Sequence, residues 1–174
     1  MKLVAGLLCL LCLCAASQNS FGQPKGVNKN EWNALLKKAK AGDAETQGLV
    51  AFALQKDDPR DSVYWYMKAC DNNDMASLEI YGAELIQPKE LKGFVSKDPQ
   101  KGLALLEKAS KLGSKRADFY LGVHYGFGKD GVEQDSEKAL LHLKRAKAGG
   151  FPGSTEALAK LEAEIKAKET GVTP

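Results

Sequence analysis

A repeated pattern of helix starts and stops constrains this 174-residue chain more than any other feature. When residues 57–74 (DDPRDSVYWYMKACDNND) are laid over residues 97–114 (KDPQKGLALLEKASKLGS), the segments align without a gap at an offset of 40 residues. In both, Asp precedes Pro, which is typical of a helix N-cap followed by the first helical position, where the missing proline N–H costs nothing. A third copy begins at Asp135 and ends at Gly150. The pattern predicts an array of similar helical units.

Small residues recur in phase with these units. Each predicted helix stop is followed nine residues later by Gly or Ala; the stops are Gly42, Asn73, Gly113 and Gly150, and the small residues are Ala51, Gly82, Gly122 and Ala159. Glycine inside a helix is unfavourable by roughly 1 kcal/mol relative to alanine, so close packing must offset it. We therefore expect four antiparallel helix pairs, in which the small residue lets the second helix of a pair approach the first.

Helix signals dominate the chain, and β-branched or alternating runs typical of strands are almost missing. Ser154 is the expected cap of the last helix, whose polar face (Lys160, Glu164 and Lys168) suits the end of an array that must stay soluble. The predicted fold class is all-α, with helices at about 31–41, 44–55, 59–72, 74–87, 99–112, 115–126, 136–148 and 154–168.

The first residues have the composition of a secretory signal peptide. Lys2 precedes a run of about fourteen apolar residues, and small polar residues follow. The run is shorter than the roughly 20 residues that span a bilayer, so an uncleaved anchor is disfavoured. Cleavage after Ser17 or after Gly22 satisfies the small-residue rule, and we favour Gly22. This interpretation predicts a periplasmic or secreted protein with no membrane insertion after cleavage.

Three of the four cysteines, Cys9, Cys12 and Cys14, lie in the predicted signal peptide, so the mature chain keeps only Cys70. No intrachain disulfide can then form, although an oxidising compartment would permit one. A lipid-modified Cys14 is an alternative, but Leu13 stands where bacterial lipoprotein signals have a small residue. We interpret Cys70 as a buried thiol in place of a small core residue.

Composition and motifs disfavour several classes of function. One cysteine and two separated histidines, His124 and His142, form no recognised metal-binding spacing, and no cofactor or metal is expected. The net charge of +3 comes from interspersed Lys and Glu, which argues against nucleic-acid binding. The GFGKDG stretch at 126–131 lacks the phosphate-loop frame and is flanked by acidic residues. GGFPGST at 149–155 has free N–H groups for an anion but is better explained as a turn into a helix.

Catalysis is also disfavoured. His124 and His142 suggest an acid/base pair with Asp135 or Glu137, but catalysis needs a nucleophile or a water site within hydrogen-bond reach of the base. No G-x-S-x-G or comparable frame occurs in the chain. A hydrolase therefore stays an alternative that loss of turnover on His124→Ala would support, and we predict a protein that is not an enzyme.

Residues 117–146 have the pattern A-xxx-LG-xx-Y-xx-G-xx-GV-xx-D-xx-KA-xxx-L-xx-A, which closely resembles the Sel-one-like repeat, a relative of the tetratricopeptide repeat. His142 stands where the family usually has tryptophan. Residues 76–113 match less closely because their interhelix loop is longer, and residues 44–73 match less again because theirs is shorter. The resemblance implies an α/α-solenoid of about three and a half helix-pair repeats.

The resemblance implies binding rather than chemistry. Proteins of this kind act as adaptor scaffolds, and exported bacterial members bind envelope or secreted proteins; some neutralise antibacterial effectors of type VI secretion as immunity proteins. A cysteine-rich subgroup acts on β-lactams but depends on a disulfide in each repeat, which Cys70 alone cannot supply. We expect a non-catalytic interaction module in the bacterial envelope that serves as an immunity or inhibitor protein. The alternative is a housekeeping adaptor or regulator of a periplasmic or membrane assembly.

Aromatic residues on the predicted solenoid surface are the candidate partner-binding residues. Tyr120, His124 and Phe127 recur at i, i+4 and i+7, so they form one stripe along a helix. Aromatic residues on an exposed face are typical of interaction hot spots, although burial against a neighbouring helix would also explain them. Tyr64 is a second candidate, and Phe94 in the long loop 86–98 is a third.

The predicted domain organisation has four segments. They are a signal peptide at 1–22, an N-terminal tail at 23–30, the repeat solenoid at 31–168 and a C-terminal tail at 169–174.

Overall fold

The computed structural model describes residues 21–171. The predicted signal segment lies almost wholly outside these residues, as do Cys9, Cys12 and Cys14 and the end of the C-terminal tail. Within 21–171, no helix is both long enough and apolar enough to cross a membrane.

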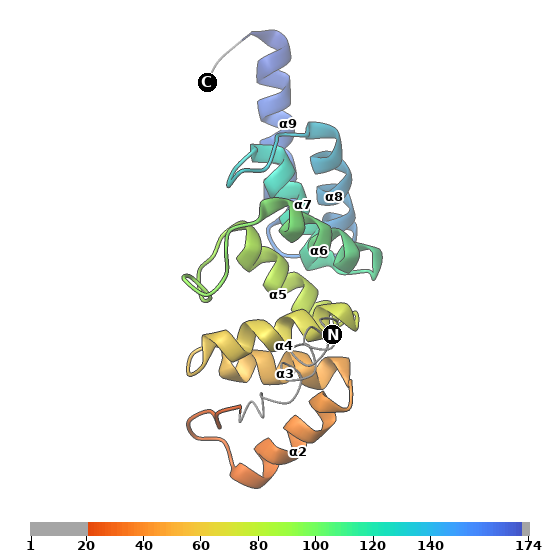
Figure 1. Ribbon diagram of the computed structural model, residues 1–174. Helices are drawn as coiled ribbons and strands as arrows, with labels where there is room; N and C mark the ends of the chain where they lie inside the picture. The colour runs from red at the N-terminus through yellow and green to blue at the C-terminus, as the bar shows by residue number, and fades with distance from the viewer. Residues whose placement is uncertain (1–20, 172–174) are drawn as a thin grey trace, which may run out of the picture.

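The described chain folds as an elongated stack of antiparallel helices, with α2 at one end and α9 at the other (Figure 1). The predicted all-α solenoid is confirmed, and every expected helix is present with its ends within two residues of prediction. The helices are α2 (Lys29–Lys40), α3 (Ala44–Leu54), α4 (Pro59–Asp71), α5 (Met75–Ile86), α6 (Pro99–Lys111), α7 (Lys115–Phe127), α8 (Ser136–Ala148) and α9 (Ser154–Thr170).

The predicted caps explain where three of these helices begin. The carboxylates of Asp58, Asp98 and Asp135 each accept a hydrogen bond from the backbone N–H three residues ahead, over 3.2, 3.0 and 2.9 Å. Asn73 takes the left-handed conformation expected of a helix stop, with φ of 64°. The prediction for Ser154 is wrong: Gly153 is the N-cap of α9, and the Ser154 hydroxyl donates instead to the carbonyl of Phe151 at 2.6 Å. The turn before α9 thus has its own internal hydrogen bond.

The small residues mark close helix crossings, but the crossing partner differs from the one we expected. A methyl group built on Gly82 would lie 3.0 Å from the carbonyl oxygen of Gly102, so α5 crosses the following helix α6 rather than the preceding α4. Gly122 in α7 likewise faces Leu143 in α8. The close pairs are therefore α3 with α4, α5 with α6 and α7 with α8, flanked by α2 and α9 as single helices.

This pairing also explains the outcome at the two remaining small positions. Ala51 is fully buried, and its carbonyl accepts a hydrogen bond from the Ser62 hydroxyl of α4 at 2.7 Å. Ala159 is exposed, because α9 has no following helix to meet. The requirement for a small residue therefore depends on the next helix along the chain.

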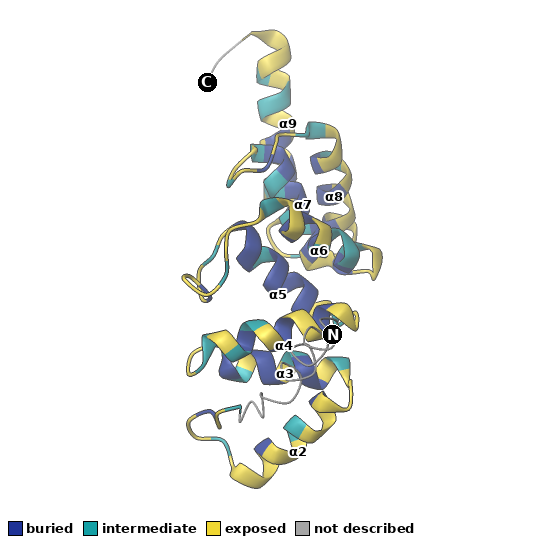
Figure 2. Ribbon diagram, viewed as in Figure 1, coloured by how far each residue is buried: buried dark blue, intermediate teal, exposed yellow. Residues whose placement is uncertain are grey.

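Helix α5 lies at the middle of the stack and is buried along most of its length (Figure 2). Its apolar side chains, among them Leu78 and Ile86, belong to the continuous core that runs through all the repeats. Two of its buried residues are acidic, Glu79 and Glu84. Buried carboxylates need hydrogen-bond partners, and the partners of this pair shape the surface described next.

Candidate protein-binding groove

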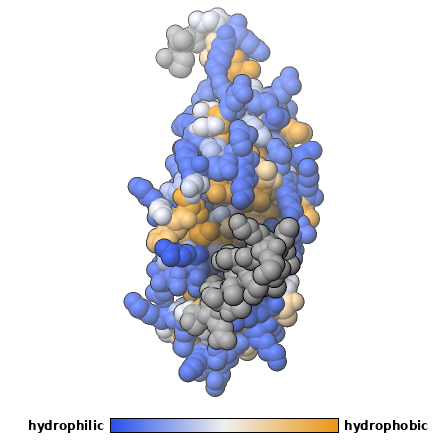
Figure 3. Space-filling model, viewed as in Figure 1, coloured by the Kyte–Doolittle hydropathy of each residue, from blue (hydrophilic) through white to orange (hydrophobic). Residues whose placement is uncertain are grey.

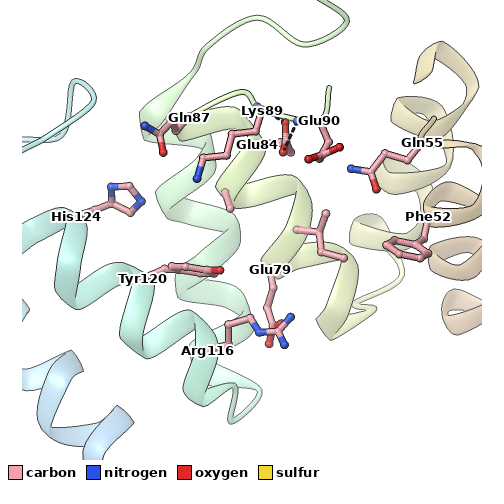
Figure 4. A pocket seen from close by; sticks show the side chains of 12 residues that line it. Phe52, Gln55, Glu79, Glu84, Gln87, Lys89, Glu90, Arg116, Tyr120 and His124 are labelled. Atoms are coloured by element: carbon pink, nitrogen blue, oxygen red, sulfur yellow. Dashed lines mark hydrogen bonds and ion pairs between the residues drawn. The ribbon is translucent and has the colours of Figure 1, made fainter. Parts of the chain in front are cut away.

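A groove of about 310 Å³ runs across the middle of the solenoid. Helices α3, α5 and α7, which are the first helices of the three pairs, and the loop 87–98 form it (Figure 4). Its lining residues are Phe52, Gln55, Glu79, Ile80, Ala83, Glu84, Gln87, Lys89, Glu90, Arg116, Tyr120 and His124.

The floor of the groove is apolar and has an aromatic residue on either side. Ile80 and Ala83 of α5 are partly buried, while Phe52 of α3 is 65% exposed. Tyr120 of α7 lies on the opposite side of the groove from Phe52 (Figure 4). Figure 3 shows hydrophobic residues gathered at the level of α5, beside the loop 87–98, on a face that is otherwise mostly hydrophilic. This apolar surface is open to solvent.

Glu84 fixes the loop that forms one wall of the groove. Its two carboxylate oxygens accept hydrogen bonds from the backbone N–H groups of Lys89, Glu90 and Leu91, over 2.9, 3.2 and 3.0 Å. Leu91 is fully buried next to this anchor. Hydrogen bonds to an ionised group are among the stronger ones in proteins, so the wall is held in one position before any partner arrives.

Glu79 links α5 to the start of α7 in a similar way. It accepts a hydrogen bond from the hydroxyl of Ser114, the N-cap residue of α7, and forms an ion pair with Arg116 at 3.5 Å. The side chain of Arg116 is half exposed, so this ion pair lies at the rim of the groove. The acidic residues that line the floor are thus engaged with the scaffold.

His124 is the histidine on the α7 side of the groove. It is partly buried, and this burial lowers the pKa of its imidazole; the ammonium of Lys89 lowers the pKa further, and the carboxylate of Asp130 acts in the opposite direction. A neutral imidazole can donate one hydrogen bond and accept another. His124 therefore offers a partner a polar contact beside Tyr120.

The structure brings together two of the five candidate partner-binding residues, Tyr120 and His124. Phe127 does not line the groove: its ring lies below the ammonium groups of Lys129 and Lys160, at 5.8 and 4.9 Å from the centroid. The stripe turns away because its last member faces α9 rather than α5. Phe127 as a partner contact stays a prediction.

The other two candidates lie in separate places. Tyr64 on α4 is 41% exposed and packs edge-on against Trp65 at 5.3 Å. Phe94, at the tip of the long loop, is 49% exposed. Neither lines the groove. A role in partner binding stays a prediction for both of them.

Sequence reasoning missed Phe52, the most exposed aromatic residue of the groove. A signal was present: Phe52 directly follows Ala51, one of the recurring small residues, and the corresponding positions in the next repeats are Ala83 and Val123. An aromatic ring where the other repeats have a small or medium apolar residue indicates a surface that differs from the common scaffold.

The histidines do not form the imagined catalytic pair. His142 is buried, and its Nδ1 lies 3.0 Å from the carboxylate of Asp118, which also accepts a hydrogen bond from the Ser110 hydroxyl at 2.6 Å. Its ring stacks on Tyr125, so it packs where the family usually has tryptophan. Asp135 is occupied as the cap of α8. Asp118 as the partner of His142 is a contact that the sequence pattern did not indicate.

Cys70 is buried, as interpreted from sequence. Burial raises the pKa of its thiol to about 12, with further contributions from the nearby carboxylates of Asp74 and Asp71, while Lys108 opposes them. In the part of the chain that the structure describes, no cluster of three His, Cys, Asp or Glu residues has the arrangement of a metal site.

Comparisons with known proteins agree with this architecture. The sequence model of the Sel1 repeat matches residues 44–74, 90–114 and 115–151. The fold is similar to that of a Sel1 repeat protein from Oxalobacter formigenes, with a TM-score of 0.65 at 21% identity over 75% of this chain and 98% of that one. A search of curated protein sequences finds no significant match.

A second solved structure is similar over more of this chain. It is a protective antigen of uropathogenic Escherichia coli strains with an SLR fold, and the TM-score is 0.69 at 25% identity over 85% of this chain. This chain spans 33% of the length of that protein. Sel1 repeats act as protein–protein interaction modules, which agrees with an open apolar groove on a rigid scaffold. With three matched repeats that follow one another along the solenoid, the chain belongs to the Sel1 repeat family.

Proposed function

We propose that this chain is an exported, non-catalytic protein that binds a partner protein in the bacterial envelope through the groove of α3, α5 and α7. The observation that carries the proposal is an apolar floor between two aromatic residues, Phe52 and Tyr120, beside a wall that Glu84 holds in place. Exposed apolar patches of this kind on a folded domain mark interaction sites. A preformed site also avoids the entropy cost of ordering on binding.

Among partners, we propose a toxic antibacterial effector, which this protein neutralises as an immunity protein. The described chain is small and consists of one repeat module. Of its two histidines, His142 is paired with Asp118 in the interior and His124 lines the groove. Such a protein acts by occupying a surface of its partner. The groove accepts a protruding side chain or a short segment of the partner, with the charged residues Lys89, Glu90 and Arg116 around the contact.

Site-specific photo-crosslinking in the native host tests where the partner binds. p-Benzoylphenylalanine placed at Phe52 or at Tyr120 should crosslink one partner protein, which mass spectrometry identifies. The matched control positions are Leu112 and Leu141, which are 50% and 48% exposed and lie outside the groove. Equal crosslinking at the control positions would contradict the groove as the binding site.

The purified partner then decides the biological role. Deletion of this protein should sensitise cells to the partner when the partner is an effector, and the combined change Tyr120→Ala with His124→Ala should fail to restore resistance. The same double variant should keep its helical circular dichroism and a cooperative melting transition, because both side chains line the groove and are only partly buried. Unfolding would instead show that they are core residues. A partner that is a resident envelope enzyme or assembly would support an adaptor in place of an immunity protein.

A further inference from the structure

The segment before α2 packs on α4 through an aromatic residue. The ring of Phe21 lies 4.8 Å from that of Trp65 and 5.7 Å from that of Tyr64, measured between centroids. The ammonium of Lys40 lies 5.5 Å from the centroid of the same ring. Phe21 is half-buried, and Trp65 is only 2% exposed. Phe21 thus forms part of the packing of the first repeat.

The residues that follow Phe21 are also held in place. Pro24 is buried, and the backbone N–H of Lys25 donates a hydrogen bond to the carboxylate of Asp57 at 2.8 Å. Pro24, Lys25 and Val27 line a hollow of about 670 Å³ that shares Phe52 with the groove. The N-terminal segment therefore belongs to the folded protein.

We propose that signal peptidase cuts this chain after Ser17, so that the mature protein keeps Phe21. The inference rests on the proposed export, and it differs from the cleavage site after Gly22 that we favoured from sequence. Both candidate sites have small residues at the positions that the enzyme requires. A cut after Gly22 would discard Phe21 and uncover the ring of Trp65, which leaves an apolar surface without its partner. A cut after Ser17 keeps the contacts of Phe21 with Tyr64 and Trp65 and that of Lys25 with Asp57.

The mature N-terminus tests the proposal directly. The full-length chain is expressed with its own leader, the exported protein is purified, and its intact mass is measured together with its N-terminal sequence. A first residue of Gln18 is expected. A first residue of Gln23 or later would overturn the proposal. A chain that still begins at Met1 would contradict the export on which the proposal rests. The groove crosslinks test partner binding independently of the cleavage site.

A second measurement reports on the packing itself. The chain has two tryptophans, so Trp32→Phe in every version leaves Trp65 as the reporter. Adding Phe21→Ala to the full-length precursor should make Trp65 emission more easily quenched by acrylamide and lower the melting temperature by roughly 3–8 °C. Phe94→Ala is the matched control, since Phe94 is half exposed at a loop tip and should change neither readout.

Comparing the mature wild type with the mature Phe21→Ala variant distinguishes the two candidate cut sites, because Phe21 lies between them. If the cut fell after Gly22, the mature wild type and the mature Phe21→Ala variant would be the same molecule. Identical quenching and melting would then overturn the proposal. A difference between the two proteins supports a cut upstream of Phe21.

Discussion

The second and third repeats place the same two-helix unit side by side with connections of different length. In the second repeat, the loop 87–98 extends from the stack between α5 and α6, whereas in the third repeat a shorter loop at 128–135 joins α7 to α8 (Figure 1). Despite this difference, the backbone N–H of the capping Asp98 donates to the carbonyl of Leu85 at 2.8 Å, and that of Asp135 donates to the carbonyl of Tyr125 at the same distance. The helix pair is conserved within the chain while its connection varies.

One residue in each repeat shows how the connection is accommodated. Counted from the crossing glycines, Glu84 and His124 occupy the same position on α5 and α7. Glu84 holds the long loop through three backbone N–H groups, whereas His124 lines the groove. The shorter connection of the third repeat is held by Gln134, whose amide donates to the carbonyl of Gly126 at 2.6 Å. The helix crossing therefore determines the fold, and the variable connection with its anchoring residue determines the shape of the groove.

The largest expected effect comes from the crossing that both repeats share. A methyl group at Gly102 would lie 2.6 Å from the carbonyl oxygen of Gly82, so Gly102→Ala forces the helices apart. We expect the free energy of unfolding to fall by about 2–3 kcal/mol, measured from urea denaturation.

The control for this variant is another buried helical glycine. A methyl group at Gly126 would lie 3.4 Å from Ala139 and from Leu161, so Gly126→Ala meets only tight side-chain contacts. It should be neutral or stabilise by up to about 1 kcal/mol, because alanine is the better helix former. Equal destabilisation by the two variants would show that the crossing at Gly102 is not specially close.

An intermediate effect is expected at the loop anchor of the second repeat. Glu84→Gln replaces one acceptor oxygen with an NH₂ group that faces backbone donors, which should lower the free energy of unfolding by about 1–2 kcal/mol. Lys89 and Leu91 share one carboxylate oxygen, which the amide oxygen of Gln replaces, so hydrogen exchange should accelerate at the amide of Glu90, which then faces the NH₂ group. Glu90→Gln, at an exposed position of the same loop, and His124→Gln, at the corresponding position of the third repeat, should leave the amide of residue 90 protected.

The smallest effect concerns the titration of His124. Burial lowers its folded-state pKa below the ordinary value of 6.5, so the unfolded chain binds the proton more readily. The contribution to stability is fully present above about pH 6.5 and decreases as the pH falls towards the lowered pKa. Urea denaturation at several pH values should show this decrease in wild type but not in His124→Gln. An NMR titration that gives an ordinary pKa for His124 would contradict the prediction.

Much of the fold could be predicted because its signals are local. Asp58, Asp98 and Asp135 cap helices through contacts within one turn, and Asn73 stops a helix through its own backbone conformation. The partner of each crossing could not be predicted in the same way. The glycine at position 82 predicts one close neighbouring helix, which could be the preceding or the following one. Only the stacking of α5 on α6 shows that it is the following helix.

The groove was partly predicted, since Tyr120 and His124 lie in it while Phe127, Tyr64 and Phe94 do not. Helical periodicity places residues on one face of a helix, but it does not say which neighbouring helix that face meets. Phe52 joins the groove from another helix, α3, and Lys89 joins it from the anchored loop. Arg116 joins it from the start of α7, the same helix as Tyr120 and His124.

The sequence by itself determined the helices, their caps, the repeat and the need for small residues at the crossings, because these depend on backbone geometry and on contacts between near neighbours. Only the tertiary structure decided the partner of each crossing, the buried contacts of Glu84 and of Asp118 with His142, and the packing of Phe21 on Trp65. Such contacts join residues far apart in the chain, and their energies depend on burial that exists only after the helices have stacked.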